Sequence, residues 1–144
     1  MSRDFQVTFD ANDPARLAEF WSEALGYIIQ PPPDGYESWD DWATAMGIPA
    51  ENWNDARALV DPDGDRPRIF FQRVPEGKTA KNRVHLDVNV GGGPGSSPDE
   101  RKARVDEAVN NLVAVGATIV GPVEQRGEYW VVLGDPEGNE FCVQ

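Results

Sequence analysis

Polar side chains that can bind or react alternate with apolar ones in two segments of this chain, residues 5–10 and 83–90. The polar positions are Gln6, Thr8 and Asp10 in the first segment and His85, Asp87 and Asn89 in the second. Because successive side chains of a strand point to opposite faces, each segment predicts a strand with one apolar and one polar face. A polar face must meet water or a ligand, since a buried polar group without a partner is costly. If the strands curve, these faces line a concave cup, the usual form of a small-molecule site.

Two further segments extend the polar faces, and each follows an Asp-Pro turn. Residues 61–65 form a turn before a strand at 68–74, and residues 135–139 form another before the segment 140–144. The predicted lining of the cup is Gln6, Thr8, Phe70, Gln72, His85, Asp87, Trp130 and Cys142. The carboxylates of Asp87 and Glu140 could move a proton there, but no nucleophile accompanies them, so the catalytic residues stay unassigned.

Each of the two polar strands leads into a helix with recognisable ends. Asp13 is placed to cap the first helix, and Gly26 to end it. Ser97 and Glu100 form a capping box for the second, which should stop at Gly116. Three more strands are predicted after each helix: residues 27–30, 57–60 and 68–74 in the first half, and residues 117–120, 129–133 and the stretch ending at Gln144 in the second.

The order of elements is therefore β-α-β-β-β, repeated once, which predicts an α+β fold with an internal repeat. We expect a single domain over residues 1–144, with a first module at 4–75 and a second at 81–144. Residues 31–56 interrupt the first module as an insertion that carries Trp39, Trp42 and Trp53. A short helix from residue 38 to about residue 46 is expected there. This insertion either packs as a flap over a cleft or covers the edge of a sheet.

The composition narrows the classes of partner. The chain has 25 acidic residues against 13 Lys and Arg, a net charge of −12. Nucleic acid and anionic membranes need basic surface, so neither is expected as a partner. The charge suits a cationic small ligand, although solubility alone also explains it. With no signal peptide, no membrane-length apolar run and a single cysteine, Cys142, we expect a cytoplasmic protein.

The order of these motifs resembles the glyoxalase/bleomycin-resistance family, also called the vicinal oxygen chelate superfamily, and within it the actinobacterial glyoxalase-like branch. The resemblance covers essentially the whole chain, from residues 13–26 through 81–88 to 135–142. It implies two βαβββ modules that form curved mixed sheets, and a homodimer. The superfamily includes lyases, isomerases, dioxygenases, thiol transferases and proteins that sequester antibiotics, so the resemblance alone does not assign an activity.

Metal-dependent members of this family place one ligand on the first strand and one on the last strand of each module. The matching positions are Gln6, Gln72, His85 and Cys142, with Phe70 as an alternative to Gln72 because the extra residues around Pro67 leave the register open. Cys142 departs from the family pattern, because a carboxylate is expected there, and a set with two neutral amides suits hard divalent ions poorly. The cofactor is accordingly none or one divalent metal. We expect a small-molecule-binding protein, for example one that sequesters a cationic or aromatic compound; the alternative is a metal-dependent lyase or isomerase that acts on a small oxygen-rich substrate.

Overall fold

The computed structural model describes residues 1–144, which form two compact units, Met1–Gly77 and Lys78–Gln144. Each unit has one four-stranded mixed sheet and a long helix after its first strand. The predicted α+β fold with tandem βαβββ modules is confirmed. None of the helices combines the length and the apolar character that a membrane crossing requires.

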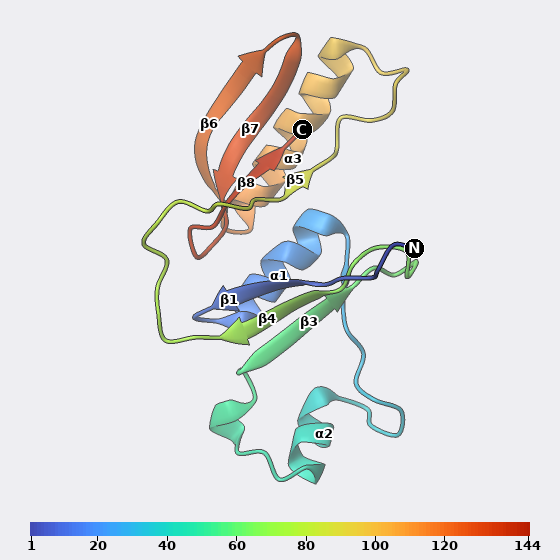
Figure 1. Ribbon diagram of the computed structural model, residues 1–144, viewed down its shortest axis with the longest axis vertical. Helices are drawn as coiled ribbons and strands as arrows, with labels where there is room; N and C mark the ends of the chain where they lie inside the picture. The colour runs from blue at the N-terminus through green and yellow to red at the C-terminus, as the bar shows by residue number, and fades with distance from the viewer. The chain divides into compact units, whose positions relative to one another are not determined.

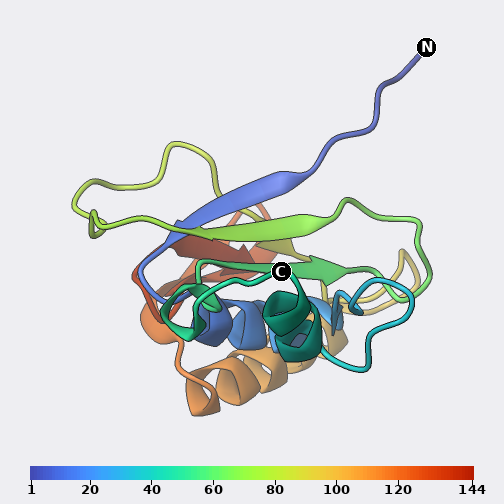
Figure 2. The same ribbon diagram turned by 90° about the horizontal axis from the view of Figure 1, so that it is seen from below.

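The sheet of the first unit has the strand order β1-β4-β3-β2, and α1 lies on one of its faces (Figure 1 and Figure 2). Its outer pair, β1 and β4, is parallel, whereas the other pairs are antiparallel. The elements are β1 (Val7–Ala11), α1 (Pro14–Leu25), β2 (Ile28–Ile29), α2 (Trp39–Ala45), a 3-10 turn η1 (Ala50–Asn52), β3 (Ala56–Val60) and β4 (Ile69–Arg73).

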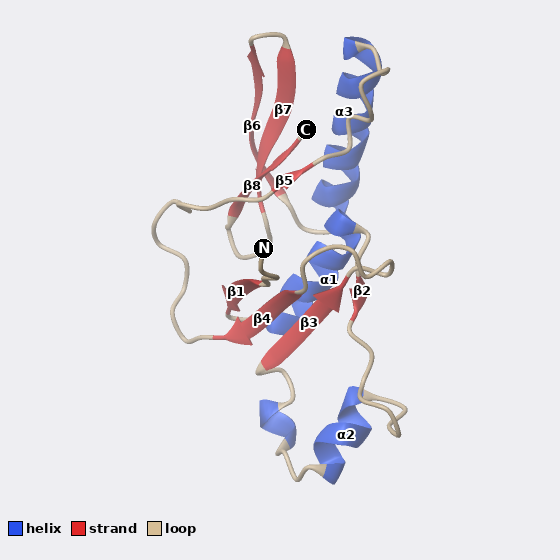
Figure 3. Cartoon of the chain, turned by 45° about the vertical axis from the view of Figure 1, so that its right-hand side comes forward, coloured by secondary structure: helices blue, strands red, loops and turns tan.

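The second unit repeats this plan with the strand order β5-β8-β7-β6, and α3 runs along β7 and β8 on one face (Figure 3). Here β5 and β8 are the parallel pair. The elements are β5 (Asp87–Val88), α3 (Pro98–Ala114), β6 (Thr118–Gln125), β7 (Glu128–Gly134) and β8 (Glu140–Val143).

The core of the first unit lies between α1 and the sheet. Asp13 caps the helix by accepting a hydrogen bond from the Arg16 amide, and Gly26 ends it in the left-handed conformation at φ 67°. The ring of Phe9 lies 5.1 Å from Trp21 of α1 and 5.3 Å from Phe71 of β4, centroid to centroid. Trp21 and Phe71 are almost fully buried, so the apolar face of β1 is used for packing and its polar face stays open.

The second unit has the same layering. The capping box of Ser97 and Glu100 is present, and α3 buries Val105, Val109 and Leu112. Against them pack Leu133 of β7 and both Phe141 and Val143 of β8, all at most 1% exposed. Because side chains alternate along a strand, the residues between these core positions lie on the face away from α3.

The two Asp-Pro turns have matching internal hydrogen bonds. The buried carboxylate of Asp61 accepts from the amides of Asp63 and Asp65, at 3.3 and 3.2 Å. The buried carboxylate of Asp135 accepts from the amides of Glu137 and Asn139, at 2.9 and 3.0 Å. Gly64 and Gly138 adopt φ values of 77° and 85°, which favour glycine. Both aspartates therefore act as turn caps, and each turn delivers the last strand of its module.

Strand lengths differ from the prediction in the second unit. Residues 83–90 were expected as one strand, but only Asp87 and Val88 are regular, and Val84 is 82% exposed. β5 pairs only with the four-residue strand β8, and before it the Asn82 amide is held at 2.9 Å by the side chain of Glu140 and not by a strand ladder. In contrast β6 extends to Gln125, well beyond the expected residues 117–120.

Candidate functional site

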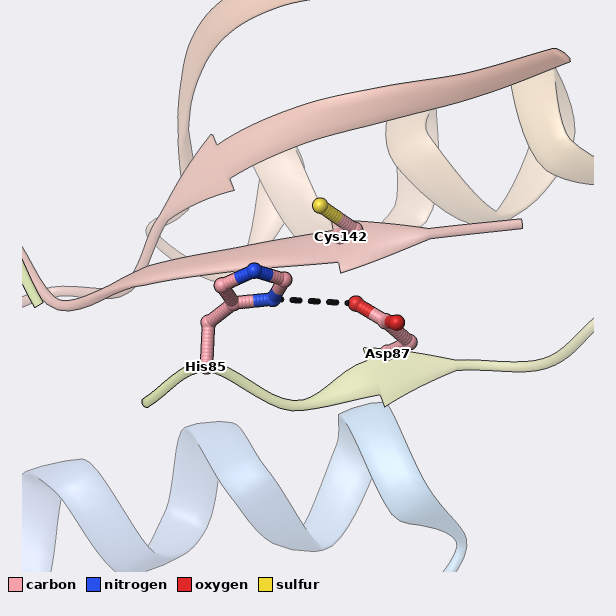
Figure 4. Close-up of side chains that lie close together, drawn as sticks. All are labelled: His85, Asp87 and Cys142. Atoms are coloured by element: carbon pink, nitrogen blue, oxygen red, sulfur yellow. Dashed lines mark hydrogen bonds and ion pairs between the residues drawn. The ribbon is translucent and has the colours of Figure 1, made fainter. Parts of the chain in front are cut away.

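The open face of the second sheet places the most reactive side chains of the chain together. β5 and β8 run in parallel with Asp87 directly opposite Cys142, and the Cys142 amide donates to the Leu86 carbonyl at 3.0 Å. Figure 4 shows the imidazole of His85 and the carboxylate of Asp87 pointing toward each other on the β5 segment, with the Cys142 thiol above them on β8.

His85, Asp87 and Cys142 form one cluster. The Nδ1 atom of His85 lies 3.0 Å from Oδ1 of Asp87, and one ligand atom from each of the three residues lies within 4.8 Å of the others. The side chains of His85 and Asp87 are 44% and 43% exposed, whereas Cys142 is 8% exposed. The cluster thus combines two half-exposed polar groups with a buried cysteine.

The environment keeps the Cys142 thiol protonated. Its burial raises the pKa of the thiol above the ordinary value, and the negative charge of Asp87 and a hydrogen bond to its carboxylate raise it further. A thiolate is the nucleophilic form of cysteine, so Cys142 is a weak nucleophile in this setting.

Glu140 lies on the same face but is already engaged. Its carboxylate forms an ion pair with Lys78 Nζ at 3.0 Å and accepts from the Asn82 amide at 2.9 Å. The hydrogen bond from Asn82, followed by that from Lys78, lowers the pKa of Glu140 to about 2. Such a carboxylate is a poor acceptor of protons near neutral pH and serves mainly to hold the segment before β5.

A cavity of about 390 Å³ opens over this cluster. Its wall combines the polar cluster with the apolar surface of Trp130 and Val132 from β7. Lys81 and Gln144 complete the rim, and Gln144 donates to Asn89 at 3.0 Å, which continues the row of polar pairs along β5 and β8. Trp130 was predicted in the lining, whereas Lys81 was not, and neither was the contact of Lys78 with Glu140. Both lysines lie in a basic stretch, residues 78–83, just before the predicted strand.

The predicted site residues of the first unit are arranged differently. Gln72 lies opposite Asp10 and donates to it at 2.8 Å, while Thr8 lies opposite Phe70. Gln6 accepts a hydrogen bond from Arg68 at 2.9 Å. The structure therefore does not bring Gln6 and Gln72 together, since Gln72 lies opposite Asp10, four positions further along the chain than Gln6. A metal ligand beside a guanidinium would also be electrostatically unfavourable.

The chemistry of the second-unit cluster suits one kind of metal. An imidazole nitrogen, a carboxylate oxygen and a thiolate are all ligands of zinc, and three protein ligands leave one position open, as in catalytic zinc sites. His85, Asp87 and Cys142 would be the residues that hold such an ion. Binding would require Cys142 to lose its proton.

Comparisons with known proteins agree with this architecture. A family profile described as the glyoxalase-like domain matches residues 6–144. A glyoxalase/bleomycin resistance protein/dioxygenase family enzyme from Burkholderia phytofirmans superposes with a TM-score of 0.61 at 20% identity, covering 96% of this chain and 94% of that one. The fosfomycin resistance protein FosX from Mesorhizobium loti superposes with a TM-score of 0.62 at 12% identity, covering 100% of this chain and 91% of that one. Lactoylglutathione lyase from Agrobacterium tumefaciens superposes with a TM-score of 0.55 at 14% identity, covering 99% of this chain and 92% of that one. No match was found among curated proteins.

Proposed function

The chain belongs to the family of glyoxalase-like domains, and from that premise we propose that it binds a small organic molecule on the open face of its second sheet. The observation that carries this proposal is the cavity of about 390 Å³, in which Trp130 and Val132 adjoin the His85–Asp87 pair. Small-molecule sites of this size are usually concave, with apolar walls and a few polar groups that orient the ligand.

The lining supports an aromatic ligand with a cationic group. Trp130 supplies a flat apolar surface for a ring, and Asp87 supplies a half-exposed negative charge. Glu140 contributes little charge for a ligand, because Lys78 already pairs with it. The net charge of −12 adds a general attraction for cations. In this function the protein binds its ligand, and no bond needs to break.

The indole N–H signals of the tryptophans can test this proposal. The probe is 2-naphthylmethylammonium, titrated into 15N-labelled protein, with the five indole signals assigned by Trp→Phe variants. We expect a saturable shift of the Trp130 signal, while the fully buried Trp21 stays unchanged. Because Asp87 is half-exposed, Asp87→Asn should weaken binding only about threefold. The matched control Glu128→Gln removes an exposed acid outside the cavity and should leave the affinity unchanged.

The proposal fails if the ammonium probe leaves the Trp130 signal unshifted up to millimolar concentration. It also fails if Asp87→Asn leaves the affinity unchanged, since the negative charge of the cavity would then have no role.

The zinc-type cluster favours a second candidate function, a metal-dependent lyase or isomerase. A bound zinc ion would polarise a carbonyl or a pair of vicinal oxygens of the substrate. Asp87 would then serve as a ligand, and the remaining carboxylate, Glu140, has a pKa of about 2 and accepts protons poorly. The lack of a suitable base is why we rank this candidate second.

Metal content separates the two candidates. Elemental analysis of protein purified without chelator would give one equivalent of zinc if the second candidate holds, and Cys142→Ser should abolish this zinc binding. The control Asn89→Asp changes a neighbouring position on the same face and should not. A protein free of metal that still binds the naphthyl probe supports the first candidate.

The predicted homodimer and cytoplasmic location are part of this proposal. Sedimentation velocity at several concentrations would measure the oligomeric state, and fractionation of cells would measure the location. A monomer at all concentrations would remove the dimer from the proposal without affecting the site on the second sheet.

A further inference from the structure

The Trp-rich insertion of the first unit is a built structure with fixed side chains. The indole of Trp39 donates to the Gln30 carbonyl at 2.7 Å, and that of Trp53 donates to the Ile48 carbonyl at 2.9 Å. At its far end, Asn54 binds the Asp13 carboxylate at 2.8 Å and accepts from the Ala15 amide at 2.9 Å. These contacts tie both ends of the insertion to the βαβ framework of the first unit.

A second cavity of about 390 Å³ lies between this insertion and the sheet of the first unit. Trp39 and Trp42 meet edge to face with ring centroids 5.4 Å apart, and both line the cavity with Trp53 and Phe70. All four rings are only partly buried, so they retain surface for a ligand. Four aromatic rings around one space favour a flat aromatic guest.

Two arginines line this cavity, Arg57 and Arg68, and Arg68 is fixed beside the ring of Phe70. The guanidinium of Arg68 lies 5.2 Å from the centroid of the Phe70 ring, and it donates to the amide oxygens of Gln30 at 2.6 Å and Gln6 at 2.9 Å. Both partners are neutral, and no carboxylate lies within ion-pair distance of Arg68. In a chain with 25 acidic residues and 13 Lys and Arg, an oriented arginine without an acidic partner is a position where a ligand can supply the anion.

The two acidic residues of the lining leave this charge in place. Asp55 already pairs with Arg73 at 3.4 Å and accepts from Asn52 at 2.8 Å. Asp40 lies exposed in the first turn of α2, where the helix N-terminus favours a negative charge. Arg57 also lines the cavity, but its guanidinium donates to the backbone carbonyls of Trp53 and Ala56. Arg68 is the cation of the lining that lies against an aromatic ring.

We propose that the cavity under the insertion is a separate binding site for a planar aromatic anion, with its ring among Trp39, Trp42 and Phe70 and its carboxylate or similar group at Arg68. The site lies wholly within the first unit and does not depend on the ligand of the second sheet. The indole N–H of Trp42 has no hydrogen-bond partner in the structure and gives such a guest a further donor.

Three probes with the same ring test the charge preference: 2-naphthoate, neutral 2-naphthamide and 2-naphthylmethylammonium. We expect 2-naphthoate to shift the indole signals of Trp39, Trp42 and Trp53 saturably and to leave that of Trp21 unchanged. The amide should bind about tenfold more weakly, as expected for the loss of a charge-assisted hydrogen bond. The net charge of −12 works against anions in general, so this preference must come from the cavity itself.

Matched variants locate the preference. Arg68→Gln should remove the advantage of 2-naphthoate over the amide, whereas Arg66→Gln, two residues earlier and outside the cavity, should keep it. Trp42→Leu should weaken all probes at this site, and Trp130→Leu should weaken none of them. The proposal is overturned if 2-naphthoate binds no tighter than 2-naphthamide, or if Arg68→Gln keeps the full preference for 2-naphthoate. It is also overturned if 2-naphthoate shifts mainly the indole signal of Trp130. The first two outcomes do not bear on the ammonium probe at the second sheet.

Discussion

The paired Asp-Pro turns lead to a quantitative prediction about stability. In Asp135→Ala the amides of Glu137 and Asn139 lose an acceptor, and the Asn139 side chain loses partners at 3.1 and 2.9 Å. Each hydrogen bond to a charged group contributes about 1.5–3 kcal/mol, but water can reach part of this turn. We therefore expect the free energy of unfolding to fall by about 3 kcal/mol.

The same substitution in the first turn should cost less. Asp61 holds its two amides at 3.3 and 3.2 Å, longer than the bonds of Asp135, and its ion pair with Arg66 spans 3.7 Å to an exposed side chain. An ion pair of this length to a largely exposed guanidinium contributes little. We expect Asp61→Ala to reduce the free energy of unfolding by about 1 kcal/mol.

Urea unfolding followed by circular dichroism measures both changes, provided that the dependence on urea concentration stays the same in each variant. Asp63→Ala is the control, because its exposed side chain lies at the tip of the turn, and it should change stability by less than about 0.5 kcal/mol. The reasoning is refuted if Asp61→Ala destabilises the protein as much as Asp135→Ala does.

Three further predictions concern single groups. The pKa of Glu140 is lowered to about 2 from its ordinary 4.5, so its contribution to stability is present above pH 4.5 and is lost as the pH falls toward 2. Glu140→Gln should therefore flatten this part of a plot of melting temperature against pH. An unchanged slope would contradict the assigned contacts. Asp87→Asn should lower the pKa of the Cys142 thiol, because it removes the negative charge that raises this pKa. The ultraviolet absorbance of the thiolate should then appear at lower pH than in the wild type. A pKa that stays the same or rises would show that Asp87 does not act on the thiol. Gly26→Ala should cost about 1 kcal/mol in urea unfolding, because φ is 67° and no atom lies close enough to clash; no loss would mean that the helix end relaxes easily.

Much of the fold was predictable from local chemistry. The caps at Asp13 and Ser97 and the left-handed Gly26 act through neighbouring backbone, so the sequence nearby is enough to place both long helices. The alternation of residues 140–143 likewise predicts which side of β8 faces α3.

The length of β5 and the register of the first-unit pair could not be read in this way. The length of β5 depends on where β8, more than 50 residues along the chain, pairs with it. The sequence left the register of Gln72 open, with Phe70 as the alternative. The structure places Phe70 opposite Thr8 and Gln72 opposite Asp10, and that register depends on how β1 meets β4 across the sheet. Contacts between distant segments decide both features, and the order of residues does not reveal them.

The shortness of β5 also affects how the second-sheet site would respond to a ligand. β5 is the outermost strand in the order of its sheet and pairs only with β8, so His85 and Asp87 lie on a segment that can open while the rest of the sheet stays folded. A molecule held by this pair would bind only the closed form and would stabilise it by mass action. Ligand affinity and the local folding of this edge would thus be two parts of one equilibrium, and Lys78, which holds the edge through Glu140 and lies outside the cavity lining, would affect binding without touching the ligand.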